Sequence, residues 1–291
     1  MNEEFGPEIP IYRSLSNLHK LSSHLYWDLY SCLISPTTPS NYLKLYLSSD
    51  SSQKFEHLKK DFKSSFSINH KNVLRIEGIY LNPLTLEMGI LLEKLPQSLK
   101  DVSESEGELD LQEKIFIASQ IVQGMEFLHE THGASSNISN ELIFLDDSLE
   151  IVKLMPIDKN LQDSIKGRLY LNAEIYLKMM EEAFIQPEFL EIEKDFFDRR
   201  PENDIWSLGL VLYEMFAKNE GLDKEKEEII KIKDRKKKVL LYSNWVEKIE
   251  VETNFQSAGE IKKIIQKCLK VKKEERLSAN EILESLGNPL I

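Results

Sequence analysis

Asp204-Ile205-Trp206-Ser207-Leu208-Gly209 opens a run that is almost wholly apolar as far as Phe216. A helix that is apolar on all sides has to be buried, so this run predicts a central buried helix. Apolar residues at helical spacing predict two amphipathic helices downstream, at 261–269 and 279–286, and a long one upstream, at 111–130. The second part of the chain is therefore predicted to be mainly helical.

The first hundred residues show a different pattern. Short apolar or β-branched runs, separated by Ser, Pro, Asn and Thr, predict strands at 26–34, 42–47, 73–81 and 88–92. Helical spacing of Phe55, Leu58, Phe62 and Phe66 predicts one helix between the second and third of these strands. The sequence thus predicts an α+β fold, with a small sheet lobe followed by a larger helical lobe and a break near residues 95–97.

Composition sets limits on function. The chain has 291 residues, 41% hydrophobic, with a formal charge of −12 and a pI near 5.2. This charge argues against a general affinity for nucleic acid or an anionic membrane, and no apolar run is long enough to span a bilayer. Cys32 and Cys268 form no disulfide framework, and the N-terminus lacks an apolar signal core, so we expect an intracellular protein, cytoplasmic or nuclear.

One basic run stands apart from this acidic background. It comprises Lys231, Lys233, Arg235, Lys236, Lys237 and Lys238. We interpret it as a solvated face of a helix or loop, with a docking surface for an acidic partner as the alternative.

The order of elements and a series of motifs resemble those of eukaryotic protein kinases. The Asp204–Gly209 stretch matches the family's D-x-W-S-x-G pattern closely. The other matches, in chain order, are Asn41–Lys44 to V-A-I-K, His70–Val73 to H-x-N-I, Leu92-Glu93 to the gatekeeper and first hinge residue, Phe127–His129 to Y-L-H, Gln186–Glu188 to A-P-E, and Arg276 to the arginine that pairs with the A-P-E glutamate.

The resemblance implies a single kinase-like domain over residues 1–291, with an N-lobe at about 12–95 and a C-lobe at about 96–288. It also implies a structural ion pair between Glu188 and Arg276, and structural roles for Asp204 and Trp206. Residues that would transfer phosphate have to be checked one by one.

The glycine-rich loop is missing. Its position corresponds to 21–29, where Ser22, His24 and Trp27 fall on the three glycine positions. Because no glycine occurs between Gly6 and Gly78, this conclusion does not depend on the alignment. Backbone amides could not approach a phosphate as they do in the family.

The catalytic loop H-R-D-x-x-x-x-N corresponds to residues 135–142. Asn137 replaces the catalytic Asp, and an amide cannot accept the proton of the substrate hydroxyl. Leu142 replaces the magnesium-binding Asn, and a hydrocarbon cannot bind a hard cation. An alternative register starting at His132 also lacks the Asp, since no Asp occurs between Asp110 and Asp146.

The magnesium motif D-F-G begins at Pro156, which takes the place of the metal-binding Asp. A two-residue slip would offer Asp158 as a ligand, at the cost of the Phe and the Gly. No metal site is expected.

Three further positions belong to the nucleotide cleft that the resemblance implies. Lys44 takes the place of the phosphate-pairing lysine, with Asp61 as its partner on the regulatory helix and Glu93 at the hinge. Lys44 could equally be a leftover lysine inside the cleft. Tyr42 stands where the family has a small alanine above the adenine and is expected to fill that slot, unless its ring turns away.

These losses predict a pseudokinase that binds neither ATP nor magnesium. It is expected to act as a protein-binding scaffold or an allosteric regulator in signalling, with an active kinase or another signalling protein as its partner. Two alternatives stay open, a divergent enzyme using Lys44, Asp158 and Asp146 or Asp147, and a nucleotide-binding switch without catalysis. Since Ser136 replaces the arginine that would receive a phosphorylated residue, Tyr170 and Tyr176 are expected to be packing residues.

Overall fold

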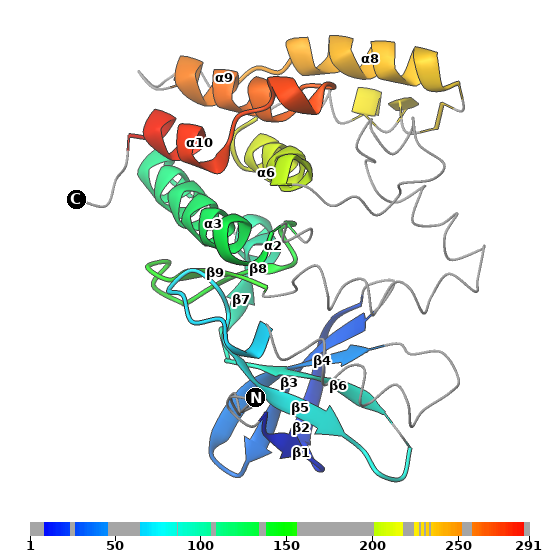
Figure 1. Ribbon diagram of the computed structural model, residues 1–291, viewed down its shortest axis with the longest axis vertical. Helices are drawn as coiled ribbons and strands as arrows, with labels where there is room; N and C mark the ends of the chain where they lie inside the picture. The colour runs from blue at the N-terminus through cyan, green and yellow to red at the C-terminus, as the bar shows by residue number, and fades with distance from the viewer. Residues whose placement is uncertain are drawn as a thin grey trace, which may run out of the picture.

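The computed structural model describes residues 9–23, 27–45, 65–85, 87–105, 109–133, 138–155, 201–217, 224–226, 228–229, 231–232, 234–251 and 258–287. A sheet forms the first part and helices dominate the second, with a small second sheet between them (Figure 1). The predicted bilobal α+β fold is confirmed.

The first sheet has six strands in the order β1-β5-β6-β4-β3-β2. Neighbouring strands are antiparallel except for β1, which runs parallel to β5. The strands are β1 (Ile11–Tyr12), β2 (Ser16–Ser23), β3 (Trp27–Ser35), β4 (Thr38–Leu45), β5 (Ile76–Leu81) and β6 (Met88–Leu92).

Strands β3 to β6 correspond to the four predicted strands, whereas β1 and β2 were not predicted. The sequence of β2 is rich in Ser, His and Asn and lacks the apolar alternation that identifies a strand. The predicted helix at 53–66 lies outside the described residues except for its last two positions, Ser65 and Phe66.

The sheet has two buried faces. Leu29, Leu43 and Ile90 lie on the face toward the helical lobe, here called the cleft face, and they cluster with Leu142 and Phe144 of that lobe. The opposite face, here called the outer face, carries a cluster of Cys32, Tyr42, Tyr80 and Leu91, against which Tyr12 and Leu15 of the N-terminal segment pack.

On the outer face, the backbone of Leu43 and the ring of Tyr42 approach Gly89 of β6 closely. A Cβ at this position would lie 2.2 Å from the carbonyl oxygen of Leu43 and 2.4 Å from a ring carbon of Tyr42. Glycine is therefore required here because the neighbouring backbone and the tyrosine ring occupy the space that a side chain would need.

We expect Gly89→Ala to lower the free energy of unfolding by about 1–3 kcal/mol, the usual cost of overpacking a core. Urea denaturation measures the change. Gly259→Ala in helix α9 (Ala258–Cys268) is the matched control, since nothing lies within 4 Å of a Cβ there. That control should be neutral or stabilise the helix by up to about 1 kcal/mol, and equal effects at the two sites would contradict the close approach.

The second part begins with a three-stranded antiparallel sheet of order β7-β8-β9. Its strands are β7 (Gln97–Ser98), β8 (Ile143–Leu145) and β9 (Val152–Leu154). The helices, besides α9, are α2 (Leu99–Glu104), α3 (Leu111–His132), α6 (Pro201–Phe216), α8 (Arg235–Glu247), the 3₁₀ helix η2 (Lys273–Glu275) and α10 (Ala279–Ser285).

The helical core forms around α6, as the apolar run predicted. Ile205, Trp206 and Leu208 are at most 1% exposed and cluster with residues of α3, α8, α9 and α10. A Cβ on Gly209 would lie 2.8 Å from the Cβ of Cys268, so α6 and α9 pack closely at this glycine. The burial of α6 follows from its having no polar face to present to water.

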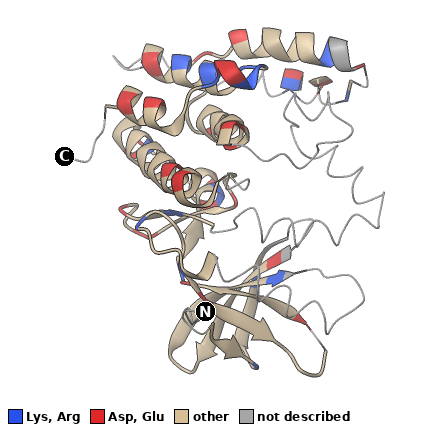
Figure 2. Ribbon diagram, viewed as in Figure 1, with Lys and Arg blue, Asp and Glu red and all other residues tan. Residues whose placement is uncertain are grey.

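Charges are distributed unevenly over the two lobes. Most charged residues among those described lie on the helical lobe, and the six-stranded sheet is largely uncharged (Figure 2). The basic run begins before α8, where Lys231 is exposed, and continues into the first turn of that helix, where Lys237 is exposed and burial lowers the pKa of Lys238. A docking role for this run remains a hypothesis.

Candidate functional site

A cavity of about 240 Å³ lies between the cleft face of the sheet and the helical lobe. Its apolar walls are Leu21 and Leu29 from β2 and β3, Leu95 from the lobe connection, and Phe144 from β8. The polar lining residues are Gln97, Ser98, Lys100, Asp101, Glu104 and Glu141, and Pro96 completes the lining. This cavity occupies the position where the kinase resemblance places the nucleotide cleft.

Lys44 and Tyr42 do not line this cavity. The Tyr42 ring turns away from it, which is the alternative that the sequence left open, and Lys44 does not lie inside the cleft. Side chains alternate between the two faces of a strand, and Leu43 of β4 packs in the cleft-face cluster. Tyr42 lies in the outer-face cluster with Tyr80. The alignment to V-A-I-K is therefore offset by one residue, since it assigns Tyr42 and Lys44 to the cleft, whereas Leu43 is the residue that faces it.

The outer face provides both residues with a common partner. Glu87 accepts a hydrogen bond from Tyr42 Oη at 3.0 Å through one carboxylate oxygen and forms an ion pair with Lys44 Nζ at 2.9 Å through the other. The hydrogen bond to Glu87 raises the pKa of Lys44, and burial raises that of the Tyr42 phenol. Asp61, the predicted partner of Lys44, lies outside the described residues.

The cleft face of β4 therefore presents no lysine among its described side chains. Leu43 faces the helical lobe, and the next position of the same parity is 45, a leucine whose side chain lies outside the described residues. A strand that turns a hydrocarbon toward the cleft cannot pair with phosphate.

Leu142, at the predicted metal-ligand position, is 5% exposed and packs with Phe144 and Met155. Its backbone accepts a hydrogen bond of 3.1 Å from Met155 N, which joins the catalytic-loop position to the end of β9. Asn137 and Pro156 lie outside the described residues. Within the described ranges, no group of three or more His, Cys, Asp or Glu residues could hold a metal ion.

The predicted counterpart of the glycine-rich loop lies where β2 ends and β3 begins. Ser22 pairs with Leu29, and Trp27 pairs with Leu45 of β4, so β2 and β3 are paired in the sheet at these positions. His24 and the side chains of Ser22 and Trp27 lie outside the described residues.

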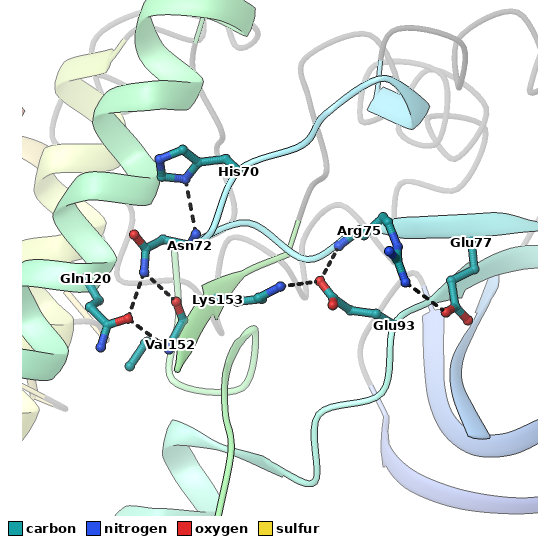
Figure 3. Close-up of polar contacts among 8 residues, drawn as sticks. All are labelled: His70, Asn72, Arg75, Glu77, Glu93, Gln120, Val152 and Lys153. Atoms are coloured by element: carbon teal, nitrogen blue, oxygen red, sulfur yellow. Dashed lines mark hydrogen bonds and ion pairs between the residues drawn. The ribbon is translucent and has the colours of Figure 1, made fainter. Parts of the chain in front are cut away.

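Glu93, predicted at the hinge, joins the two lobes (Figure 3). Its Oε1 accepts hydrogen bonds of 2.7 Å from the backbone N of Arg75 and from Lys153 Nζ on β9. Glu93 is not among the described residues that line the cavity. Its side chain is therefore engaged in holding the sheet lobe to the β8–β9 hairpin.

A second connection between the lobes is centred on Asn72. In the sequence this residue was noted only as part of the H-x-N-I match, and no contact was predicted for it. Its Nδ2 donates to Gln120 Oε1 of α3 and to the carbonyl of Val152 in β9, each at 2.9 Å (Figure 3). The Asn72 carbonyl accepts from Leu154 N at 2.9 Å. At Gly124 of α3 a Cβ would lie 2.5 Å from that carbonyl, so this glycine lets the helix approach.

His70 completes this connection. Its Nδ1 accepts a hydrogen bond of 3.1 Å from Asn72 N, and its ring stacks on Phe127 at a centroid distance of 4.5 Å. Burial, together with the charges of Lys71 and Lys153, lowers the pKa of His70 below its ordinary value of 6.5. Protonation would place a hydrogen on the nitrogen that accepts the bond.

We therefore expect the domain to lose stability as the pH falls from about 6.5 toward the lowered pKa of the folded state. The unfolded chain binds this proton first, so the contribution of neutral His70 is fully present above pH 6.5 and lost below it. Urea unfolding of wild type and His70→Gln across this range measures the effect. The variant should have the flatter profile, while His19→Gln on the exposed surface of β2 should match wild type.

The predicted structural residues converge on α6. Asp204 is fully buried, and His129 Nε2 of α3 lies 2.8 Å from Asp204 Oδ2. Arg276 donates to the carbonyls of Glu202, Lys270 and Val271. The Arg276 guanidinium lies 4.8 Å from the ring of Trp206. Glu188 lies outside the described residues, so the Glu188–Arg276 pair stays a prediction.

Comparison with known proteins supports the kinase resemblance. The protein kinase domain model matches residues 42–286, most of the chain. This chain belongs to the protein kinase family. The match begins within β4 and extends through α10, so it covers part of the sheet lobe and the helical lobe.

Three relatives are similar to this kinase domain at low identity. The LRR receptor-like serine/threonine-protein kinase ERL1 of Arabidopsis thaliana is 24% identical over 68% of this chain and 20% of its own length. The human tyrosine-protein kinase STYK1 is 28% identical over 50% of this chain and 35% of its own. A probable inactive serine/threonine-protein kinase of Dictyostelium discoideum is 22% identical over 77% and 18%.

The chain thus spans about a fifth to a third of the length of these relatives. Among the helices that the structure describes, none combines the length and the apolar character needed to cross a bilayer.

ATP with magnesium, which the kinase family implies, does not fit the described residues of this kinase domain. The lysine of β4 lies on the outer face with Glu87, and a buried Leu142 takes a metal-ligand position. Three carboxylates and one lysine line the cavity, giving the lining a formal charge of −2. An anion carrying several charges would be repelled there.

Proposed function

We propose that this kinase domain is a pseudokinase that does not bind ATP with magnesium and works by binding a protein partner. The observation that carries the proposal is the orientation of β4. Lys44 is held by Glu87 on the outer face, and Leu43 faces the helical lobe. Without a cation at the phosphates, the roughly four negative charges of ATP would be desolvated in an acidic cleft.

The substitutions in the catalytic loop and the metal motif support the same proposal. Asn137 cannot act as the base, and Leu142 and Pro156 cannot bind magnesium. The name of the Dictyostelium relative, a probable inactive kinase, agrees with a loss of activity in this part of the family. Retention of the scaffold, with Asp204, Trp206 and Arg276 in buried structural roles, supports a binding function.

We expect millimolar ATP, with magnesium or manganese, to leave the thermal unfolding temperature unchanged, and a turnover assay to remain at background. A ligand at 100 times its Kd would stabilise the fold by about 2.7 kcal/mol, so a real site is easily detected. Lys44→Met should likewise leave the nucleotide response unchanged. A stabilisation by magnesium and ATP that Lys44→Met removes would contradict the proposal and favour a divergent enzyme.

Two other results distinguish the remaining alternatives. ATP binding without metal and without turnover would identify a nucleotide-binding switch. A protein partner can be captured with the intact chain, and an active kinase is one candidate. This partner should bind wild type and Leu142→Met equally, because binding does not require phosphate transfer. Dependence of partner binding on ATP would argue against a scaffold that needs no nucleotide.

A further inference from the structure

We propose that the interlobe cavity is a binding site for a small organic cation with one aromatic ring, and not for a nucleotide. The proposal concerns binding only, and it rests on the part of the proposed function that excludes ATP from this cavity. It rests on the shape, walls and charge of the cavity.

The walls suit a single flat ring. Leu21 and Leu29 lie on one side and Phe144 of β8 on the other, with Leu95 at the lobe connection. A volume of about 240 Å³ is that of roughly eight water molecules and lies below the usual range for drug-sized ligands. An aromatic ring with a short substituent would fill it, whereas a nucleoside triphosphate would extend beyond it.

The charged residues at the rim of the cavity determine which ligand charge is favoured. Lys100 is the basic residue of the described lining, and its Nζ already lies 2.8 Å from Glu141 Oε1. Asp101 Oδ2 accepts hydrogen bonds from Ser98 N and Oγ at 2.8 and 2.7 Å, which leaves Oδ1 without a hydrogen bond from the part of the chain that the structure describes. Glu104 is exposed at the same rim.

A cation at the rim would therefore meet carboxylate oxygens, while an anion would meet a lysine whose charge is already partly balanced by Glu141. Hydrogen bonds from a charged donor to a carboxylate are stronger than neutral ones. The low dielectric of the apolar walls would strengthen that attraction. The apolar walls suit a flat ring, and the acidic rim suits a positive charge. Together these two features favour an aromatic cation as the ligand.

Benzamidine, benzamide and benzoate test the proposal, because they share one shape and differ in charge. Titrations of the full chain, followed by amide chemical shifts, give the affinity and the location together. We expect saturable binding of benzamidine at residues 95–104 and 141–144, about tenfold tighter than benzamide, with benzoate undetected. Raising the salt concentration to roughly 0.5 M should weaken benzamidine and leave benzamide unchanged.

Variants separate this site from general attraction of cations to a protein of charge −12. Glu104→Gln should weaken benzamidine about threefold to tenfold and leave benzamide unaffected. Glu260→Gln, at an exposed position on α9, is the matched control and should change neither. Leu21→Lys, at a side chain that is 48% exposed, should shift the preference toward benzoate.

The proposal would be overturned by benzoate binding as tightly as benzamidine, by shift changes elsewhere on the surface, by equal effects of Glu104→Gln and Glu260→Gln, or by no saturable binding at millimolar concentration. Displacement of benzamidine by ATP would also contradict it. Failure of the pseudokinase proposal is seen separately, in the turnover assay.

Discussion

Arg276→Leu is expected to lower the free energy of unfolding by about 3–5 kcal/mol, because three carbonyls would lose a buried charged donor, at roughly 1–3 kcal/mol each. Arg276 is 8% exposed and donates hydrogen bonds to three carbonyls. Its Nε and Nη2 donate to the carbonyls of Lys270 and Val271 after α9, and Nη1 donates to Glu202 at the start of α6. Leucine would leave these carbonyls without their charged donor.

Trp206 amplifies the effect. Its ring lies between the Arg276 guanidinium, 4.8 Å from the ring centroid, and Tyr242, 4.7 Å away and stacked at 25°. Loss of the guanidinium removes a cation–π contact as well as the hydrogen bonds. The structural role predicted for both residues follows from these contacts.

Chemical denaturation with matched variants tests this. Arg276→Lys keeps the charge but cannot direct three donors at once, so it should recover part of the loss. Lys272→Ala, which removes an exposed ion pair with Glu275, should cost no more than about 1 kcal/mol. A loss below about 1 kcal/mol for Arg276→Leu would contradict the central position assigned to this side chain.

The sequence predicted the elements that show strong periodicity. The apolar run of α6 and the amphipathic pattern of α3 are long, and their type does not depend on a single residue. The strand β1 could not be predicted because it has two residues and is stabilised by pairing with β5, far along the chain. The strand β2 could not be predicted because its own sequence lacks apolar alternation, and it is stabilised by pairing with β3.

The candidate site shows where motif reading fails. The V-A-I-K motif was aligned to Asn41–Lys44 from the sequence alone. Side chains of a strand alternate between its two faces, so an alignment error of one residue assigns every side chain to the wrong face. Glu87, which holds Lys44, lies in a separate strand connection, and no sequence signal pairs the two. The ties of Glu93 to Lys153 and of Asn72 to Gln120 were equally invisible, because they join residues far apart in the sequence.

The orientation of β4 leads to the second large expected effect, which concerns the restoration of activity. The combined variant Asn137→Asp, Leu142→Asn and Pro156→Asp returns the base and both metal ligands to the positions that the kinase resemblance gives them. Its turnover should remain at background, against the roughly 1–100 per second of active kinases. The parts of a catalytic site act as a unit, and the phosphate-pairing cation would still be missing.

A fourth substitution, Leu45→Lys, makes the test specific, because position 45 has the parity of Leu43 on the cleft face. Magnesium-dependent ATP stabilisation should appear only when this change is added, and Lys44→Met should not abolish it. Far-UV circular dichroism and urea unfolding must show that each variant is folded, since Leu142→Asn places an amide in a buried apolar cluster. Turnover by the triple variant that Lys44→Met removes would show that Lys44, and not position 45, serves the cleft, and the orientation of β4 described here would then be wrong.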